Sequence, residues 1–241
     1  MNEAAYEYTK GESDIALRPV VSSREIATPR FEVLTFSARP LVDNIAGILN
    51  FLDDSLPTIY RGKTCVSVSL DDGEVFDKSF PEYFLGKMRL QNIEPPRIEL
   101  EICESAVLSE TAWQRVIPDL AGCGFGVVVK RYIADNLDFD VLASPHIAAI
   151  KVAPQVVAEI PGSMLARRFL RGLQALANAI NKQLIVDGVE ALGQALWLEA
   201  MGCEMFQGTF YGPAMDARNA RHFVHEGRQL VSPIVFEPVT N

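Results

Sequence analysis

Short runs of β-branched residues alternate along this chain with amphipathic helical patterns, and no other feature constrains its fold as strongly. The alternation predicts eight strands, at residues 15–21, 28–36, 64–69, 98–103, 125–130, 147–152, 184–187 and 203–206. It predicts seven helices, at residues 41–56, 80–92, 109–121, 137–143, 163–181, 191–201 and 216–226. Strands that alternate with helices indicate an α/β fold in which helical crossovers connect parallel strands.

The first two predicted strands are the exception, because no helical pattern lies between them. The link Ser22-Ser23-Arg24-Glu25 is long enough to join antiparallel neighbours, whereas parallel neighbours need a crossover of about a dozen residues or more. We therefore expect a barrel that contains one reversed strand. In a barrel of this type, polar residues that follow the carboxyl ends of the strands face a common mouth.

Composition limits both the organisation of the chain and its partners. At 241 residues and 49% hydrophobic content, the chain can bury one sizeable core, so we expect a barrel domain over 15–227 between a flexible segment, 1–14, and a C-terminal tail, 228–241. The formal charge of -9 argues against nucleic acids and anionic membranes as partners. We also expect a cytoplasmic location, since we find neither an apolar run of membrane-spanning length nor a signal pattern.

Charged residues recur at the ends of the predicted strands. Lys130-Arg131 ends the Val127–Val129 run; Glu99-Leu100-Glu101-Ile102-Cys103-Glu104-Ser105 lies upstream of it, and Ile150-Lys151-Val152, Ile185–Glu190 and Gln207-Gly208 lie downstream. This series resembles the EAL domain family, the cyclic-di-GMP phosphodiesterases, over roughly residues 15 to 215. The resemblance implies a modified TIM-like (β/α)8 barrel with one antiparallel strand. It also implies hydrolysis with carboxylate-bound divalent metals, although the family has Asp-Asp-Phe where this chain has Lys130-Arg131-Tyr132.

The same resemblance assigns roles to single positions. Glu32, in Glu32-Val33-Leu34, and Glu101 match metal ligands, while Ser67 replaces a metal-binding Asn. Lys151 matches the lysine that orients the attacking water, Asp187 the general-base glutamate, and Gln207 a glutamine that contacts guanine. Glu104 matches the acid that braces the catalytic loop. Residues Glu32, Glu101, Lys151 and Asp187 are therefore expected to be vestigial, without catalysis, metal or other cofactor.

Charge at the expected site changes with these replacements. Glu32, Glu101 and Asp187 would face Lys130, Arg131 and Lys151, so we expect Lys130 and Arg131 to occupy the metal positions and to pair with those acids. The residues expected to contact a ligand, if one binds, are Arg18, Leu34, Lys130, Arg131, Lys151, Glu190 and Gln207. Considered without the resemblance, Glu101 and Asp187 fit ordinary polar residues at strand ends, and Lys130-Arg131 fits a solvated loop.

Three functions follow from this pattern. The first is an inactive EAL-like regulatory module that binds a protein partner. The second is a cyclic-di-GMP receptor that does not hydrolyse its ligand, and the third is a residual phosphodiesterase with one metal at Glu32 and Glu101. A homodimer is expected by analogy with the family. Fold analogy alone does not choose among these functions.

Overall fold

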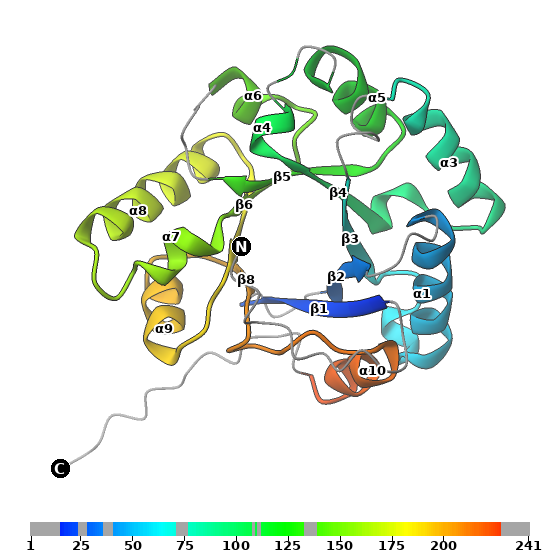
Figure 1. The fold of residues 1–241 in the computed structure, drawn as a ribbon. Helices are drawn as coiled ribbons and strands as arrows, with labels where there is room; N and C mark the ends of the chain where they lie inside the picture. The colour runs from blue at the N-terminus through cyan, green and yellow to red at the C-terminus, as the bar shows by residue number, and fades with distance from the viewer. Residues whose placement is uncertain are drawn as a thin grey trace.

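The computed structural model describes residues 15–23, 28–35, 41–70, 77–107, 109, 112–132 and 139–227. Within them lies a closed barrel of eight strands, which confirms the predicted fold class (Figure 1). The strands are β1 (Ile15–Ser22), β2 (Arg30–Thr35), β3 (Cys65–Ser69), β4 (Ile98–Cys103), β5 (Gly126–Tyr132), β6 (Ala149–Val152), β7 (Gln183–Asp187) and β8 (Met205–Gln207). The expected flexible segment, 1–14, and tail, 228–241, lie outside the described residues.

Strand β1 runs against both of its neighbours, as the short link after it predicts. It pairs antiparallel with β2 and with β8, whereas each pair from β2–β3 to β7–β8 is parallel. The β1–β2 register sets Arg18 directly opposite Glu32. A residue in the first half of β1 therefore lies at the same end of the barrel as residues that end the parallel strands.

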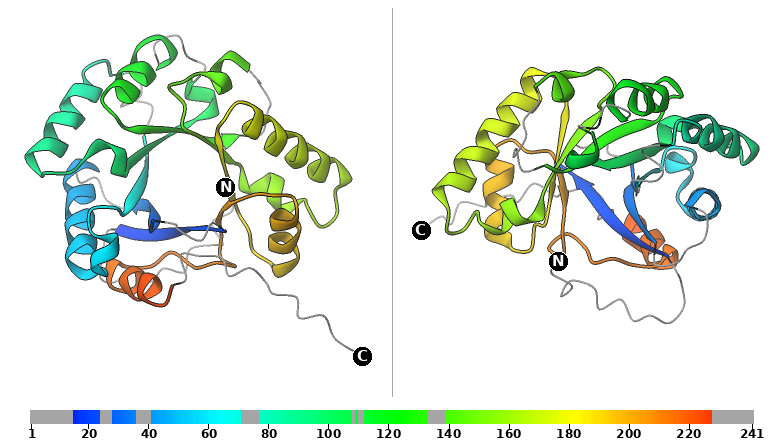
Figure 2. Two further views of the ribbon diagram at one scale, coloured as in Figure 1. Left: turned by 180° about the vertical axis from the view of Figure 1, so that it is seen from behind. Right: turned by 45° about the horizontal axis from the view of Figure 1, so that its top comes forward.

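Helices surround the barrel on its outside (Figures 1 and 2). The α-helices are α1 (Leu41–Ser55), α3 (Phe80–Leu90), α4 (Glu104–Val107), α5 (Ile117–Gly122), α6 (Phe139–Ala143), α7 (Pro154–Ala158), α8 (Met164–Ala179), α9 (Leu192–Ala200) and α10 (Ala217–His225). Short 3-10 turns cover Thr58–Tyr60 (η2) and Pro95–Arg97 (η3), and a π-helical turn, η4, covers Ala112–Val116. Among the described residues, no helix is both long and apolar enough to cross a bilayer.

The helix predicted over 109–121 is divided between the π turn and α5. Pro118 lies in the first turn of α5 and has no N–H to donate to a carbonyl of the preceding turn. A wider π turn before it relieves this conflict. The helices α4 and α7 were not predicted, because four and five residues are too few to show a helical period.

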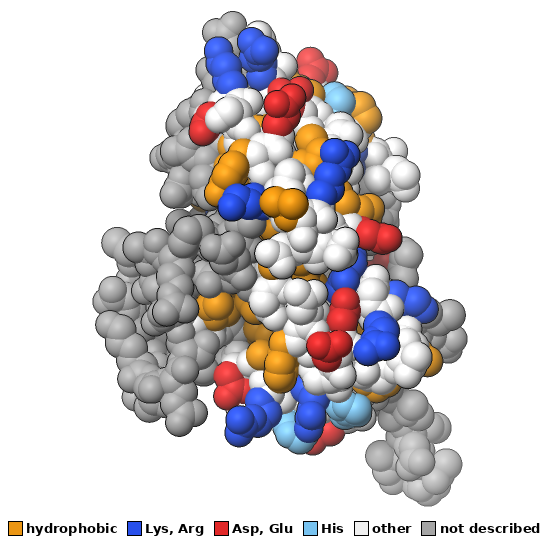
Figure 3. Space-filling view, turned by 90° about the vertical axis from the view of Figure 1, so that its right-hand side faces the viewer, with side chains coloured by type: hydrophobic (Ala, Val, Ile, Leu, Met, Phe, Trp, Pro, Cys, Tyr) orange, Lys and Arg blue, Asp and Glu red, His pale blue; other side chains and the backbone are white. Residues whose placement is uncertain are grey.

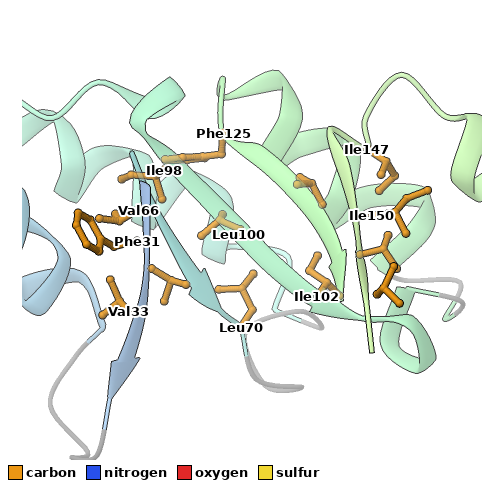
Figure 4. Close-up of a cluster of buried hydrophobic side chains, with 14 of the residues drawn as sticks. Phe31, Val33, Val66, Leu70, Ile98, Leu100, Ile102, Phe125, Ile147 and Ile150 are labelled. Atoms are coloured by element: carbon orange, nitrogen blue, oxygen red, sulfur yellow. The ribbon is translucent and has the colours of Figure 1, made fainter. Parts of the chain in front are cut away.

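The larger part of the core lies between the strands and the surrounding helices. Figure 4 shows members of this layer from β2 to β6, among them Phe31, Val66 and Leu100, each fully buried. Phe84 of α3 packs on Phe125 with ring centroids 5.0 Å apart. This packing fixes the outward faces of the strands, and with them which residues point into the barrel.

The barrel interior has a separate apolar layer made of Val20, Val128, Ala149, Ile185 and Met205. Residues two positions away along a strand share its face. On the N-terminal side of this layer Arg30 pairs with Glu99 at 2.9 Å. On the other side the inward positions are polar, and these positions form the site described next.

Candidate functional site

Six polar side chains converge inside the barrel, one layer above its inner apolar residues. They are Arg18 of β1, Glu32 of β2, Glu101 of β4, Lys151 of β6, Asp187 of β7 and Gln207 of β8. Arg18, Lys151, Asp187 and Gln207 each lie two residues along a strand from a member of the apolar layer. Glu32 lies opposite Arg18 in register, and Glu101 lies opposite Val128. The fold thus brings together six of the residues singled out in the sequence, and we call them the mouth cluster.

Lys151 lies at the centre of the mouth cluster. Its Nζ donates to Glu101 Oε1 at 2.7 Å and to Glu32 Oε2 at 3.0 Å. The lysine is only 3% exposed and Glu101 only 1% exposed. At this depth, neither charge is stable without the other.

Arg18 provides the second cation. Its Nε donates to Glu32 Oε2 at 3.0 Å, and its Nη2 contacts both Glu32 Oε2 and, at 3.2 Å, Asp187 Oδ2. The Arg18 side chain is 21% exposed, so solvent reaches it. The reversed direction of β1 explains this contact, because it places Arg18 opposite Glu32.

Gln207 completes the contacts of Glu32. Its Nε2 donates to Glu32 Oε2 at 2.9 Å, and Arg18 and Lys151 donate to the same oxygen. The loop that follows β7 holds Gln207 in place, since the backbone carbonyl of Gln207 accepts hydrogen bonds from the backbone N–H groups of Gly188 and Val189 at 3.0 Å each. Gly208 permits this approach: a Cβ there would lie 2.1 Å from the Val189 carbonyl oxygen.

Burial and ion pairing within the mouth cluster lower the pKa of one carboxylic acid and raise the pKa of the other two. Burial alone would raise the pKa of Glu32, but Lys151 and Arg18 together outweigh it and hold this pKa at about 2. Burial raises the pKa of Glu101 despite Lys151 beside it, and burial likewise raises the pKa of Asp187. Burial would lower the pKa of Lys151, yet the surrounding carboxylates, Glu101 first, raise it.

Glu32 should therefore stabilise the fold in its ionised form. Its pKa is lowered from 4.5 to about 2, so its stabilising contribution is complete above pH 4.5 and is lost as pH falls from there to about 2. We expect Glu32→Gln to reduce the free energy of unfolding at pH 7. The reduction should become smaller as pH falls from 4.5 to about 2. Urea unfolding of both proteins at several pH values measures the difference. A difference that stays constant down to pH 2 would contradict this assignment.

Lys130 lies differently from our expectation. Position 130 is two residues beyond Val128 on β5, and its register partner is Cys103 at the end of β4. Among the described residues, Lys130 forms no ion pair with Glu32, Glu101 or Asp187. The predicted pairing of Lys130 is thus wrong, and the predicted place of Arg131's side chain lies outside the described residues.

The physical reason is strand direction. Arg18 reaches Glu32 directly across the antiparallel β1–β2 pair, whereas Lys130 lies at the last inward position of β5 and is partly exposed. The sequence held a signal for this: Arg18 lies two residues before the inward Val20, on a strand already predicted to be reversed.

The other sequence candidates surround the mouth cluster without joining its ion pairs. Ser67 is buried on β3 and pairs in register with Glu32. Leu34 is partly buried near the end of β2. Glu190 is exposed before α9, where its N–H donates to Gln194 Oε1 at 2.8 Å.

A divalent ion shared by Glu32 and Glu101 does not fit this arrangement. The Lys151 ammonium lies between the two carboxylates, and three side chains already donate to Glu32 Oε2. Within the described part of the chain, no three His, Cys, Asp or Glu residues are placed to hold a metal ion. The cluster as built pairs its three acids with two cations of its own, Arg18 and Lys151.

Comparison with known proteins agrees with this fold. The family model described as "EAL domain" matches residues 48–214. The chain is 23% identical over 133 residues to the blue light- and temperature-regulated antirepressor BluF of Escherichia coli, covering 55% of this chain and 33% of BluF. It is 25% identical over 147 residues to the cyclic di-GMP phosphodiesterase PA2567 of Pseudomonas aeruginosa, covering 61% of this chain and 25% of PA2567.

The solved EAL domain of Mycobacterium smegmatis DcpA superposes with a TM-score of 0.77 at 20% identity, covering 89% of this chain and 96% of that domain. This likeness covers a larger share of the chain than the family-model match does. The chain spans about a quarter to a third of the length of the two curated relatives. Since the family model matches well over half of its residues, the chain belongs to the EAL domain family.

Proposed function

We propose that this protein is a catalytically inactive EAL-like regulatory module that acts in signalling by binding a protein partner. One observation carries the proposal: Arg18 and Lys151 form ion pairs with Glu32, Glu101 and Asp187 from within the barrel. The first two acids match the family's metal ligands, and the third matches its general base. Acids engaged in this way are not available to hold two metal ions beside an attacking water.

Electrostatics supports the same conclusion. At an effective dielectric near 20, a divalent ion about 4 Å from a fixed cation is repelled by roughly 8 kcal/mol. Arg18 and Lys151 both contact Glu32, and the sequence pattern sets Lys130 and Arg131 where the family has two metal-bridging aspartates. The long side chains relax, so the net penalty is smaller than this, yet each cation acts in the same direction.

A protein partner is supported by the kind of relative that the chain resembles. BluF, which shares 23% identity with this chain, is named an antirepressor. An EAL domain that acts without turnover needs a binding surface more than a metal site, and the barrel offers a rigid scaffold for it.

A cyclic-di-GMP receptor is the second candidate, and the chemistry of the mouth favours it. Gln207 Oε1 is buried with no hydrogen-bond partner among the described residues, so it is free to accept from a ligand. Arg18 and Lys130 are partly exposed at the same end of the barrel and carry the charge that a phosphate needs.

Cyclic-di-GMP separates the three functions. We expect calorimetric titration of the purified protein, with and without magnesium, to show no binding at micromolar concentrations, and incubation with manganese to leave the dinucleotide intact. Saturable binding of cyclic-di-GMP at micromolar concentration, weakened by Arg18→Ala and by Lys130→Ala, would favour the receptor function over the partner-binding module. Linear dinucleotide whose formation Glu101→Gln abolishes would establish a phosphodiesterase.

A further inference from the structure

The segment that contains α8 carries charge of one sign only. Residues 160–186 include four cations, Arg167, Arg168, Arg171 and Lys182, and no Asp or Glu, in a chain with 31 acids against 22 basic residues. A basic segment on a strongly acidic protein creates a local field opposite to that of the whole molecule. Two of the four cations are engaged internally, and the other two are not.

The engaged cations hold the ends of this segment. Arg167 donates to the carbonyls of Ile160 and Pro161 at 2.7 and 2.9 Å, which orders the turn before α8. Lys182 donates to the carbonyls of Ser144 and Ile147 at 2.7 and 2.6 Å. The side chains of Arg168 and Arg171 form no hydrogen bond or ion pair within the described part of the chain, and both residues are exposed.

The outward side of α8 also exposes large apolar side chains. Met164 is 60% exposed and Leu165 is 77% exposed, in the first turn of the helix. The opposite side packs on the barrel through Ala166, Leu170, Leu173 and Ala177. At 100° per residue, the exposed Met164, Leu165, Arg168, Arg171, Gly172, Ala175 and Ala179 fall on one continuous outward arc. We call this arc the α8 face.

We propose that the α8 face binds the protein partner, and that the partner contributes an acidic amphipathic segment. This inference rests on the proposed function and gives it a surface. Met164 and Leu165 would pack on the apolar side of that segment, while Arg168 and Arg171 pair with its carboxylates. The small side chains of Gly172, Ala175 and Ala179 leave the lower turns of α8 open to close approach.

Charge complementarity favours this occupant over a second copy of the chain. A symmetric dimer through the α8 face would set the same patch against itself, so the arginines of one copy would meet the arginines of the other. A membrane is a weaker fit, because the net charge of -9 repels anionic lipid and two exposed apolar residues insert little area. Figure 3 shows the surface over α1, α3 and α10, where side chains of both signs are interspersed.

The test begins with a photo-crosslinking amino acid placed in the full chain expressed in its native host. At Ala175 we expect a discrete protein adduct, and at Tyr83 of α3, which is also exposed, we expect none of the same mass. Mass spectrometry then identifies the partner and the crosslinked segment, which should be rich in Asp and Glu. Purified partner is titrated against the wild-type chain in low and high salt.

The deciding variant is Arg168→Glu with Arg171→Glu, which should weaken binding at least about tenfold and reduce its dependence on salt. The matched control, Arg89→Glu with Arg115→Glu, makes the same change in net charge at two exposed positions elsewhere and should leave binding within about twofold. Circular dichroism checks that both variants fold.

The possible outcomes distinguish failure of the α8 face as the binding surface from failure of the proposed function. A partner whose affinity falls only in the control variant, or which crosslinks from Tyr83 and not from Ala175, overturns the α8 face and leaves the proposed function standing. Flotation with vesicles of phosphatidylglycerol that depends on Arg168 and Arg171 would assign the face to a membrane instead. If no partner is captured from either position and cyclic-di-GMP binds at micromolar concentration, the proposed function itself fails.

Discussion

Replacing Lys151 by methionine should lower the free energy of unfolding by about 3–5 kcal/mol at pH 7. The ammonium is buried and contacts Glu101 and Glu32 at 2.7 and 3.0 Å. Methionine has similar length but no charge, so the substitution leaves two buried carboxylates with less compensation. We expect the loss to appear in urea denaturation as a lower midpoint with an unchanged slope.

Two further variants identify the cause of that loss. Lys78→Met removes a lysine from an exposed position and should change the free energy of unfolding by no more than about 0.5 kcal/mol. Adding Glu101→Gln to Lys151→Met removes one of the uncompensated acids and should restore part of the stability. If Lys151→Met costs no more than Lys78→Met, the mouth cluster is not the ion-paired network described above.

The second large effect concerns metal affinity. Arg18→Gln removes a cation from the mouth cluster, and Lys130→Asp with Arg131→Asp restores the two aspartates of the family pattern; together the three changes lower the formal charge of the chain by five. We expect this triple variant to bind manganese. At a concentration one hundred times the dissociation constant, one bound ion adds about 2.7 kcal/mol to stability. For a domain of this size that corresponds to a rise in melting temperature of roughly 5–10 °C.

Arg18 is the informative member of that set. It contacts both Glu32 and Asp187, so a variant that restores only the aspartates at 130 and 131 should gain less affinity than the triple variant. Adding Glu101→Gln to the triple variant should remove the gain, because one ligand is lost. A triple variant whose melting temperature does not respond to manganese would show that more than these three cations prevents metal binding.

The barrel was predictable because its signals are local and repeated. Short apolar runs and helical periods recur in alternation, and the missing helix between β1 and β2 fixes the reversed strand. The positions of Glu101, Lys151 and Asp187 followed from their places at strand ends. Their convergence then required only that the strands be parallel and the barrel closed.

The pairing within the site was not predictable to the same degree. Lys130 and Arg18 are both cations on inward positions, and the choice between them depends on which one lies opposite Glu32. That choice is a matter of strand register between β1 and β2, and a shift of one residue would turn Arg18 to the other face. The family-model match begins only at residue 48, after both of these strands.

Calorimetric titration of manganese and magnesium into the unaltered protein tests most directly whether the mouth cluster, with its acids paired to Arg18 and Lys151, still holds metal ions. If Arg18 and Lys151 pair with Glu32, Glu101 and Asp187 as the structure places them, neither ion should give saturable heat at millimolar concentration. Saturable binding of one or two ions to the unaltered protein, lost in Glu101→Gln, would contradict the account.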